Sequence, residues 1–223
     1  MRKTFFKSAV DELLWIWQKK SNNTHDLKSK IWDAWADENG SIGKAYGYQL
    51  GIKHKYKEGE FDQVDRVLYD LKHNPLSRRI MTNIYNHADL HEMNLYPCAY
   101  SMTFNVTGNR LNGILNQRSQ DMLVANNWNV CQYAVLLHMF AKVSGLVAGE
   151  LVHVIADAHI YDRQIRVIDR HIPIVEELIK REPLPAPTFE IDDIDDFYKF
   201  TVDNVRLKDY NYHEFNIKIP VAE

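Results

Sequence analysis

The chain is poor in the features that mark several large classes of protein. Only two of its 223 residues are cysteine, which excludes a disulfide-stapled scaffold and favours a reducing, cytoplasmic location. Lysine and arginine (27) are outnumbered by aspartate and glutamate (30), so no dedicated nucleic-acid surface is expected. No apolar run approaches the roughly 18 residues that a membrane span requires, and acidic residues within the amphipathic start of the chain argue against a signal peptide.

What the sequence does contain is material for a substantial core. Hydrophobic residues make up 45% of the chain and aromatic residues 12%. This length suits one large domain of mixed helices and strands, or two small ones. Apolar spacing predicts helices over 5–18, 61–72 and 128–143, with a short aromatic helix at 31–35 and a late helix ending near 181. Strands are predicted over 80–84, 101–106, 110–115, 149–155, 189–191, 205–207 and 215–219, with an exposed loop at 53–60.

Polar side chains interrupt the apolar runs between residues 96 and 161. They include the thiol of Cys98, the guanidinium of Arg118 and the amide of Asn129. An unpaired polar group costs on the order of 1–3 kcal/mol to bury, so these groups either satisfy one another or face a polar ligand. The second cysteine, Cys131, lies in a predicted helix, where an inert buried thiol is the ordinary outcome.

Other polar and aromatic residues allow two interpretations each. Glu12 lies beside the apolar face of the first predicted helix, and from the pattern alone a solvated or ion-paired carboxylate is favoured. Arg78 and Arg79 are either ordinary surface charge or a phosphate clamp. Trp32 and Trp35 share a helical face, which suits core packing or a stacking platform for a flat ligand.

A local duplication follows this region. The residues 160–166 are echoed directly by 167–173, with a period of seven residues. Two copies are too few for a repeat architecture, so a local insertion is the simpler interpretation.

Taken together, these motifs closely resemble the thymidylate synthase family, over essentially the whole chain and in the same order. The stretches that carry the resemblance are Asp11-Glu12-Leu13-Leu14-Trp15, Ile31-Trp32-Asp33-Ala34-Trp35, Ser77-Arg78-Arg79, Tyr96-Pro97-Cys98, Gln117-Arg118-Ser119-Gln120-Asp121, Trp128-Asn129-Val130, Asp157-Ala158-His159-Ile160-Tyr161 and Pro220-Val221-Ala222.

The resemblance implies a methyltransferase that makes dTMP from dUMP, with 5,10-methylenetetrahydrofolate supplying both the carbon and the hydride. Cys98 matches the nucleophile, a soft thiolate that adds to C6 of uracil and makes C5 nucleophilic. Arg118 matches the arginine that contacts the phosphate and this sulfur, and we expect it to favour the thiolate. Glu12 matches the glutamate that organises water for proton transfer, and Tyr46 matches a tyrosine that assists it. No metal is implied.

Further residues match binding positions of the family. Asn129 matches the amide that reads the uracil edge, donating to the C4 carbonyl and accepting from N3–H; an aspartate there would favour cytosine. His159 and Tyr161 alternate along an expected strand end and match the pair that binds the sugar 3′-hydroxyl. The remaining positions implied for dUMP are Arg78, Arg79, Ser119 and Asp121, and those implied for folate are Ile31, Trp32, Trp35, Asp121 (at the pterin) and Ala222.

The fold implied is α+β, with a large mixed sheet, helices on one face and a homodimer interface on the other. In such a dimer Arg78 and Arg79 cross to the phosphate of the other subunit, so the active sites are composite. Residues 1–223 then form a single catalytic domain that binds dUMP and folate and no membrane. RNA binding is conceivable, but the net charge of −3 gives it no support.

Four departures from the family pattern leave alternatives open. The chain starts after the arginine loop that grips the phosphate in the family, so either it is a truncated form or Arg118, Ser119 and the two adjacent arginines hold the phosphate alone. Residues 164–170 are the expected insertion. Ala99 replaces a histidine, and Glu223 ends a tail that is commonly apolar. The alternatives are an impaired core that acts only as a nucleotide- or RNA-binding dimer, and a deoxycytidylate hydroxymethylase, which Asn129 disfavours.

Overall fold

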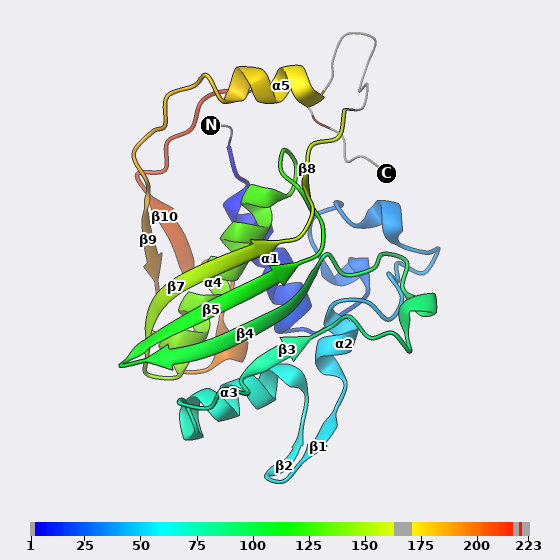
Figure 1. The fold of residues 1–223 in the computed structure, drawn as a ribbon, viewed down its shortest axis with the longest axis vertical. Helices are drawn as coiled ribbons and strands as arrows, with labels where there is room; N and C mark the ends of the chain where they lie inside the picture. Colours follow the sequence, from blue (N-terminus) through cyan, green and yellow to red (C-terminus); the bar gives the residue numbers. More distant parts are fainter. Residues whose placement is uncertain (1–2, 163–170, 216–218, 220–223) are drawn as a thin grey trace.

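A computed structural model describes residues 3–162, 171–215 and 219 (Figure 1). Its helices are α1 (Phe6–Trp17), α2 (Gly47–Gly51), α3 (Gln63–His73), α4 (Asn126–Val143) and α5 (His171–Leu178). Its strands are β1 (His54–Tyr56), β2 (Gly59–Phe61), β3 (Met81–Asn83), β4 (Ala99–Thr107), β5 (Arg110–Gln117), β6 (Gln120–Asp121), β7 (Val147–Ile155), β8 (Ala158–His159), β9 (Thr188–Ile191) and β10 (Val205–Lys208). Short 3₁₀ turns span Thr24–Asp26, Asp33–Trp35, Leu90–Glu92 and Phe197–Lys199.

The centre of the fold is a mixed four-stranded sheet with the order β3-β4-β5-β7. Strands β3, β4 and β5 pair antiparallel, and Gly108 supplies the positive φ of 62° that the tight β4–β5 turn needs. Strand β7 is parallel to β5, because the chain returns through α4 between them. Small two-stranded sheets pair β6 with β8, β9 with β10 and β1 with β2.

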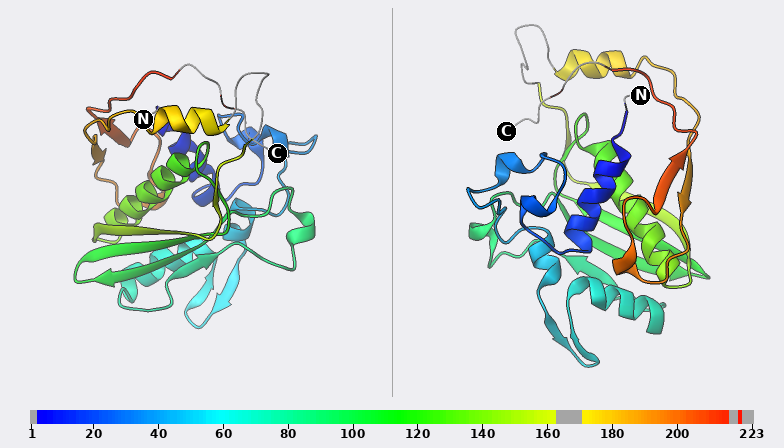
Figure 2. Two further views of the ribbon diagram at one scale, coloured as in Figure 1. Left: turned by 45° about the horizontal axis from the view of Figure 1, so that its top comes forward. Right: turned by 180° about the vertical axis from the view of Figure 1, so that it is seen from behind.

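Helices α1 and α4 pack on one face of this sheet, as the two views of Figure 2 show. Alternation along β4 sends Met102 and Phe104 into that layer, where they are 1% exposed. Phe140 of α4 packs against Phe104, with ring centroids 5.4 Å apart. Each such side chain contributes about 1.5–3 kcal/mol by leaving water. The prediction that residues 128–143 form a central, largely buried helix is confirmed.

The opposite face of the sheet carries apolar side chains that no described residue covers. The register aligns Met81 with Thr103, Thr103 with Ile114, and Ile114 with Val152 across four strands. Met81 and Val152 are each 48% exposed, and Val154 is 47% exposed. This apolar row is interrupted by Thr103, and half-exposed apolar side chains of this kind are typical of an interface.

Two local predictions need correction. Residues 53–60, expected to be a loop, form the exposed hairpin β1–β2, because Arg66 of α3 stacks on Tyr56 with 4.5 Å between guanidinium and ring centroid. The short helix expected at 31–35 is only a 3₁₀ turn. The strand predicted at 215–219 lies largely outside the described residues. The expected insertion, residues 164–170, lies wholly outside them.

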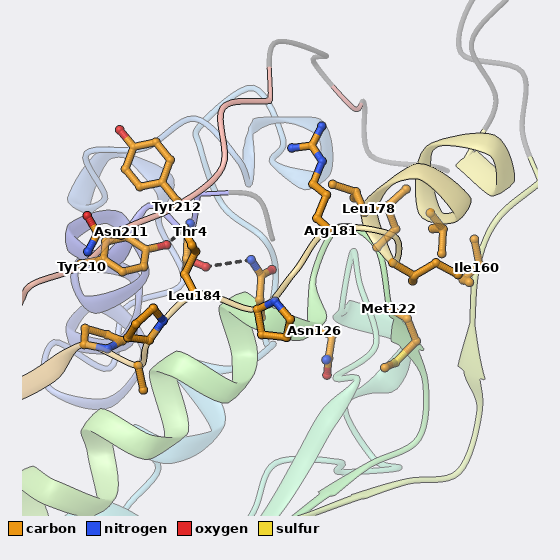
Figure 3. A pocket seen from close by; sticks show the side chains of 18 residues that line it. Thr4, Met122, Asn126, Ile160, Leu178, Arg181, Leu184, Tyr210, Asn211 and Tyr212 are labelled. Atoms are coloured by element: carbon orange, nitrogen blue, oxygen red, sulfur yellow. Dashed lines mark hydrogen bonds between the residues drawn. The ribbon is translucent and has the colours of Figure 1, made fainter.

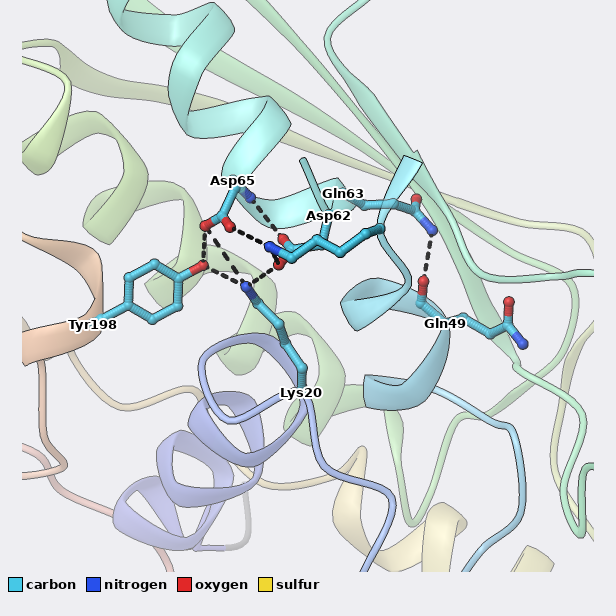
Figure 4. A network of polar contacts seen from close by, with 7 residues as sticks. Lys20, Gln49, Asp62, Gln63, Asp65 and Tyr198 are labelled. Carbon is cyan, nitrogen blue, oxygen red and sulfur yellow. Dashed lines mark hydrogen bonds and ion pairs between the residues drawn. The ribbon is translucent and has the colours of Figure 1, made fainter. Parts of the chain in front are cut away.

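A buried ion-pair network holds the end of α1 against the start of α3 (Figure 4). Asp62 is 2% exposed and accepts from Lys20 at 2.6 Å and from Lys53 at 2.9 Å. It also caps α3 by accepting from the backbone N–H of Asp65. Tyr198 donates to Asp65 and so joins the C-terminal part of the chain to this network.

Candidate active site

Cys98 and Arg118 meet where the paired strands β4 and β5 end. The pairing of Ala99 with Gln117 places them side by side, and the Arg118 N–H donates to the Cys98 carbonyl. The guanidinium is fixed by donating from Nε to Pro97 O at 3.0 Å and from Nη2 to Tyr96 O at 2.9 Å. This places Nη2 3.7 Å from Cys98 Sγ. The sheet register therefore brings a fixed cation to the thiol.

The electrostatic balance at Cys98 differs from the sequence expectation. Burial raises the pKa of the Cys98 thiol above its usual value of 9.0, and this effect outweighs the lowering by Arg118 and by Tyr46. The free site therefore holds a protonated thiol. The expectation that Arg118 favours the thiolate is correct in direction but insufficient in size.

The hydroxyl of Tyr46 contacts the backbone of Cys98. Tyr46 itself adopts an unusual backbone conformation. Its φ of 44° lies in the left-handed region, where a bulky residue is strained. This conformation aims the hydroxyl at Cys98, whose backbone N–H donates to it at 3.1 Å. Burial raises the pKa of Tyr46 well above its usual value, and the nearby Cys98, Tyr133 and Glu12 raise it further. Tyr46 thus remains a neutral hydroxyl between the thiol and the carboxylate.

Glu12 is buried, so the interpretation of a solvated carboxylate is wrong. Helix α1 packs this side against α4, leaving Glu12 4% exposed. Its Oε2 accepts from the indole N–H of Trp128 at 3.0 Å. Burial raises the pKa of Glu12 from 4.5 to about 7, and donors around it, first Gln132 and then Trp32 and Trp128, limit that rise. A carboxyl with a pKa near neutrality is suited to both giving and taking protons.

A chain of amides surrounds Asn129 on α4. Its Nδ2 donates to Gln132 Oε1 at 3.1 Å, and its Oδ1 accepts from Gln117 Nε2 at 3.4 Å. Gln117 also donates to Gln120 Oε1 and to Ser119 O. These contacts fix the orientation of the one amide that the sequence singled out for pyrimidine recognition.

Asp121 and the pair His159 and Tyr161 are brought together by the β6–β8 pairing, in which Asp121 aligns with His159. Asp121 Oδ1 accepts from the backbone of Leu123 and Val124 at 2.9 and 3.0 Å, which leaves Oδ2 without a hydrogen bond to the described residues. The rings of His159 and Tyr161 meet edge to face, 4.8 Å apart. Only His159 lies within the strand; Tyr161 follows it and is 38% exposed.

Two of the residues predicted to bind folate, Trp32 and Trp35, lie in an aromatic cluster with Tyr46. Trp32 is 6% exposed and packs against Tyr46 and Trp35, at 5.0 and 5.6 Å between ring centroids. The buried Trp32 Nε1 makes no hydrogen bond of standard geometry within the described residues. Ile31 is 38% exposed at the edge of this cluster. Trp32 thus packs in the core, as one of the two interpretations expected, while Ala222 lies outside the described residues.

Arg78 and Arg79 are not near the thiol of their own chain. Met81 aligns with Thr103, so Arg79 lies close to the level of residue 105 on β4. Seven residues of strand separate that level from Cys98, roughly 20 Å at the rise of a β-strand. Both arginines are exposed. Within one chain they cannot share a small ligand with Arg118.

A cavity lies apart from this site. It measures about 700 Å³ and is enclosed by α5, the proline-rich segment 183–187 and the tyrosines at 210 and 212 (Figure 3). None of the predicted site residues lines it. A smaller cavity of about 390 Å³ includes Arg118 with Tyr85, His87 and Tyr100. In the described part of the chain there is no cluster of three metal-ligating side chains and no helix long and apolar enough to cross a membrane.

Two residues of the site were not predicted from the sequence. Trp128 belongs to one of the family motifs without a predicted role, and Gln132 lies outside all of them. Their roles follow from the packing of α1 against α4, which brings both to Glu12. The i, i+3 spacing of Asn129 and Gln132 on a helix was the one available signal.

Comparison with known proteins agrees with this geometry. The family model for thymidylate synthase matches residues 1–223. A thymidylate synthase of Bacillus subtilis subsp. natto is 43% identical over 216 residues, which cover 95% of this chain and 75% of the relative. One from Bacillus licheniformis is 44% identical with the same coverage. The solved structure of thermostable thymidylate synthase A from Bacillus subtilis matches with a TM-score of 0.91 and 40% identity, covering 97% of this chain and 77% of that one.

The α+β fold and these matches define an enzyme of the methyltransferase class that serves dTMP biosynthesis. The chain belongs to the thymidylate synthase family. The synthase activity is thereby favoured over both alternatives, the silent binding dimer and the deoxycytidylate hydroxymethylase.

Proposed function

We propose that the chain converts dUMP to dTMP at Cys98, with 5,10-methylenetetrahydrofolate as co-substrate. The observation that carries this proposal is the convergence of a thiol, a fixed guanidinium and a buried carboxyl. Arg118 Nη2 lies 3.7 Å from the sulfur, and the pKa of Glu12 is about 7. When bound, the folate supplies one carbon and a hydride. We assign no metal to the reaction.

The roles of the chain's own residues follow from these positions. The Cys98 thiol gives its proton to water as the nucleotide binds, and the sulfur adds to C6 of uracil. C5, now nucleophilic, bonds to the carbon that the folate supplies. Arg118 stabilises the thiolate and also receives the phosphate, with Ser119 beside it. The Glu12 carboxylate, through water and with Tyr46, takes the C5 proton that leaves before the new methyl group is complete. Once a hydride has reached the new carbon, the C6–S bond breaks, the C5–C6 double bond forms again and Cys98 is released as a thiolate.

The remaining predicted residues bind the two substrates. Asn129 reads the uracil edge, and His159 with Tyr161 binds the sugar hydroxyl. Oδ2 of Asp121, which has no hydrogen bond to the described residues, suits an acceptor for the N–H groups of a pterin. The Ile31, Trp32 and Trp35 cluster suits a flat ring, since its aromatic edges stack readily. Ala222 is assigned to folate by resemblance alone.

We also propose a cytoplasmic homodimer with composite sites. The apolar row on the open sheet face supports such an interface, and the distance of Arg78 and Arg79 from their own thiol supports a role in the partner's site. Both cysteines are free, which suits a reducing compartment.

Trapping with the 5-fluoro analogue of dUMP tests the assignment of Cys98. With methylenetetrahydrofolate present, we expect a stable covalent adduct by mass spectrometry, located on the peptide that contains Cys98. The Cys131→Ser variant is the matched control and should form the adduct as the unmodified protein does. An adduct absent from the folded protein, or located on Cys131, would contradict the assignment.

A further inference from the structure

Gln132 is a buried glutamine that the proposed reaction leaves without a role. It is 3% exposed, and its hydrogen bonds are to protein groups. It lies one turn after Asn129 on α4, and the i, i+3 spacing places both side chains on the same face of the helix.

The Gln132 carboxamide bridges two elements of the site. Its Oε1 accepts from Asn129 Nδ2 at 3.1 Å, and its Nε2 donates to the carbonyl of Ala9 at 3.2 Å. Ala9 precedes Glu12 by three residues on α1, so this hydrogen bond reaches the helix that carries the buried carboxyl. Gln132 therefore ties the pyrimidine-reading amide to that helix.

The other end of the Asn129 amide is also held. Its Oδ1 accepts from Gln117 Nε2 at 3.4 Å, and Gln117 Oε1 is in turn 2.8 Å from His153 Nε2. Gln117 is itself 3% exposed, which limits its movement. The two N–H groups of Gln117 also donate to Ser119 O and Gln120 Oε1, so the hydrogen bond to Gln132 is the main anchor of the Asn129 amide. It leaves one N–H of Asn129 unbound to any described residue.

This orientation has a chemical consequence at the substrate. Uracil offers an acceptor at C4 and a donor at N3, while cytosine offers a donor at C4 and an acceptor at N3. An amide that turns over by half a rotation exchanges its donor and acceptor and so becomes complementary to cytosine. Selectivity for uracil thus requires that Asn129 does not flip.

We propose that Gln132 is a positioning residue that sets selectivity for uracil by preventing the Asn129 amide from flipping, and that it links this amide to the helix carrying Glu12. The inference rests on the proposed function, in which Asn129 reads the base. Gln132 also lowers the pKa of Glu12, which is consistent with a link between base recognition and proton transfer.

The variant Gln132→Met tests this inference, because methionine keeps the length of the side chain and removes both hydrogen-bonding groups. Gln49→Met is the matched control. Gln49 is 2% exposed, donates from Nε2 to Lys44 O at 2.9 Å and accepts at Oε1 from Asn86 at 3.3 Å, so its contacts resemble those of Gln132. The measurement is the ratio of dissociation constants for dCMP and dUMP by calorimetry, without folate.

We expect Gln132→Met to reduce this ratio by about tenfold and to move the acid limb of C5 proton release to higher pH, while Gln49→Met changes neither. The shorter Gln132→Asn, which cannot span both partners, should behave like Gln132→Met and replaces it if that variant does not fold. A folded Gln132 variant whose ratio stays within twofold of the parent overturns the inference. If the parent protein binds neither nucleotide, the proposed function fails first, and the inference falls with it.

Discussion

The indole N–H of Trp128 donates to Oε2 of Glu12 across 3.0 Å, joining helix α4 to helix α1 at the buried carboxyl. This hydrogen bond stabilises the ionised form of an acid that burial otherwise keeps protonated. Together with burial and with the donors Gln132 and Trp32, this pair helps to define the pH range in which Glu12 can act as a base.

Replacing Trp128 should shift that pH range. Trp128→Phe keeps an aromatic ring and removes the N–H, so the pKa of Glu12 rises above about 7 and the acid limb of kcat moves to higher pH. The pH profile of tritium release from 5-tritiated dUMP measures this. Trp17→Phe is the control, because the Trp17 indole packs on Tyr133 and Phe140 instead. Equal profiles for Trp128→Phe and the parent protein would contradict the assignment.

We also expect Glu12 to lower the free energy of unfolding at neutral and alkaline pH. Its pKa is 4.5 when unfolded and about 7 when folded, so the folded state holds the proton more tightly between these values. Stability from this group therefore falls as pH rises from 4.5 to 7 and stays reduced above it. The difference corresponds to about 3 kcal/mol.

Glu12→Gln removes that penalty. We expect the variant to be more stable than the parent at pH 8, by up to about 3 kcal/mol, and nearly equal to it at pH 4.5. Urea unfolding at the two pH values measures the difference, and C5 proton release should fall by about 10²–10⁴-fold. A stabilisation that is the same at both pH values would indicate another cause.

The buried ion-pair network makes a prediction about stability alone. Asp62→Asn removes the buried carboxylate that Lys20 and Lys53 share, while Asp65 stays within 3.6 Å and 3.1 Å of them, so we expect a loss of about 1–3 kcal/mol. Asp203→Asn is the control, because Asp203 pairs with Lys7 at an exposed position and should change stability by about 0.5 kcal/mol or less. Equal losses in denaturant unfolding would show that the network of Figure 4 is not the stabilising contact.

Composite sites predict complementation between two inactive forms. Cys98→Ser removes the nucleophile, and a variant with both Arg78→Ala and Arg79→Ala weakens phosphate binding. When the two are mixed and allowed to exchange subunits, one site in each mixed dimer regains a cysteine and both arginines. We expect activity to reappear on mixing and not in either protein alone. If the arginine variant keeps full activity by itself, these residues do not bind the phosphate.

The sequence predicts features that depend on neighbouring residues better than features that depend on contacts between distant parts of the chain. The strands and the turn of the β4–β5 hairpin follow from alternation and Gly108, and helix α4 follows from its apolar run. The burial of Glu12 does not, because it depends on how α1 packs against α4. A local pattern cannot show which of two helices will cover a carboxylate, and for the same reason Gln132 was missed.

The strained backbone of Tyr46 could not be predicted from the sequence either. The sequence gives no sign that Tyr46 adopts a φ of 44°, because that conformation depends on its packing against Trp32 and its contact with Cys98. The proximity of Cys98 and Arg118 was expected from resemblance, and its physical cause, the pairing of Ala99 with Gln117, is visible only in the sheet register.

The most direct test of the central claim is tritium release from 5-tritiated dUMP with methylenetetrahydrofolate, comparing the protein with Cys98→Ser. The account predicts release by the parent protein and its loss in Cys98→Ser, since C5 gives up its proton only after the sulfur has added to C6. Release that persists in Cys98→Ser, or no release from a folded and dimeric parent protein, would contradict the assignment of Cys98 as the nucleophile of an active synthase.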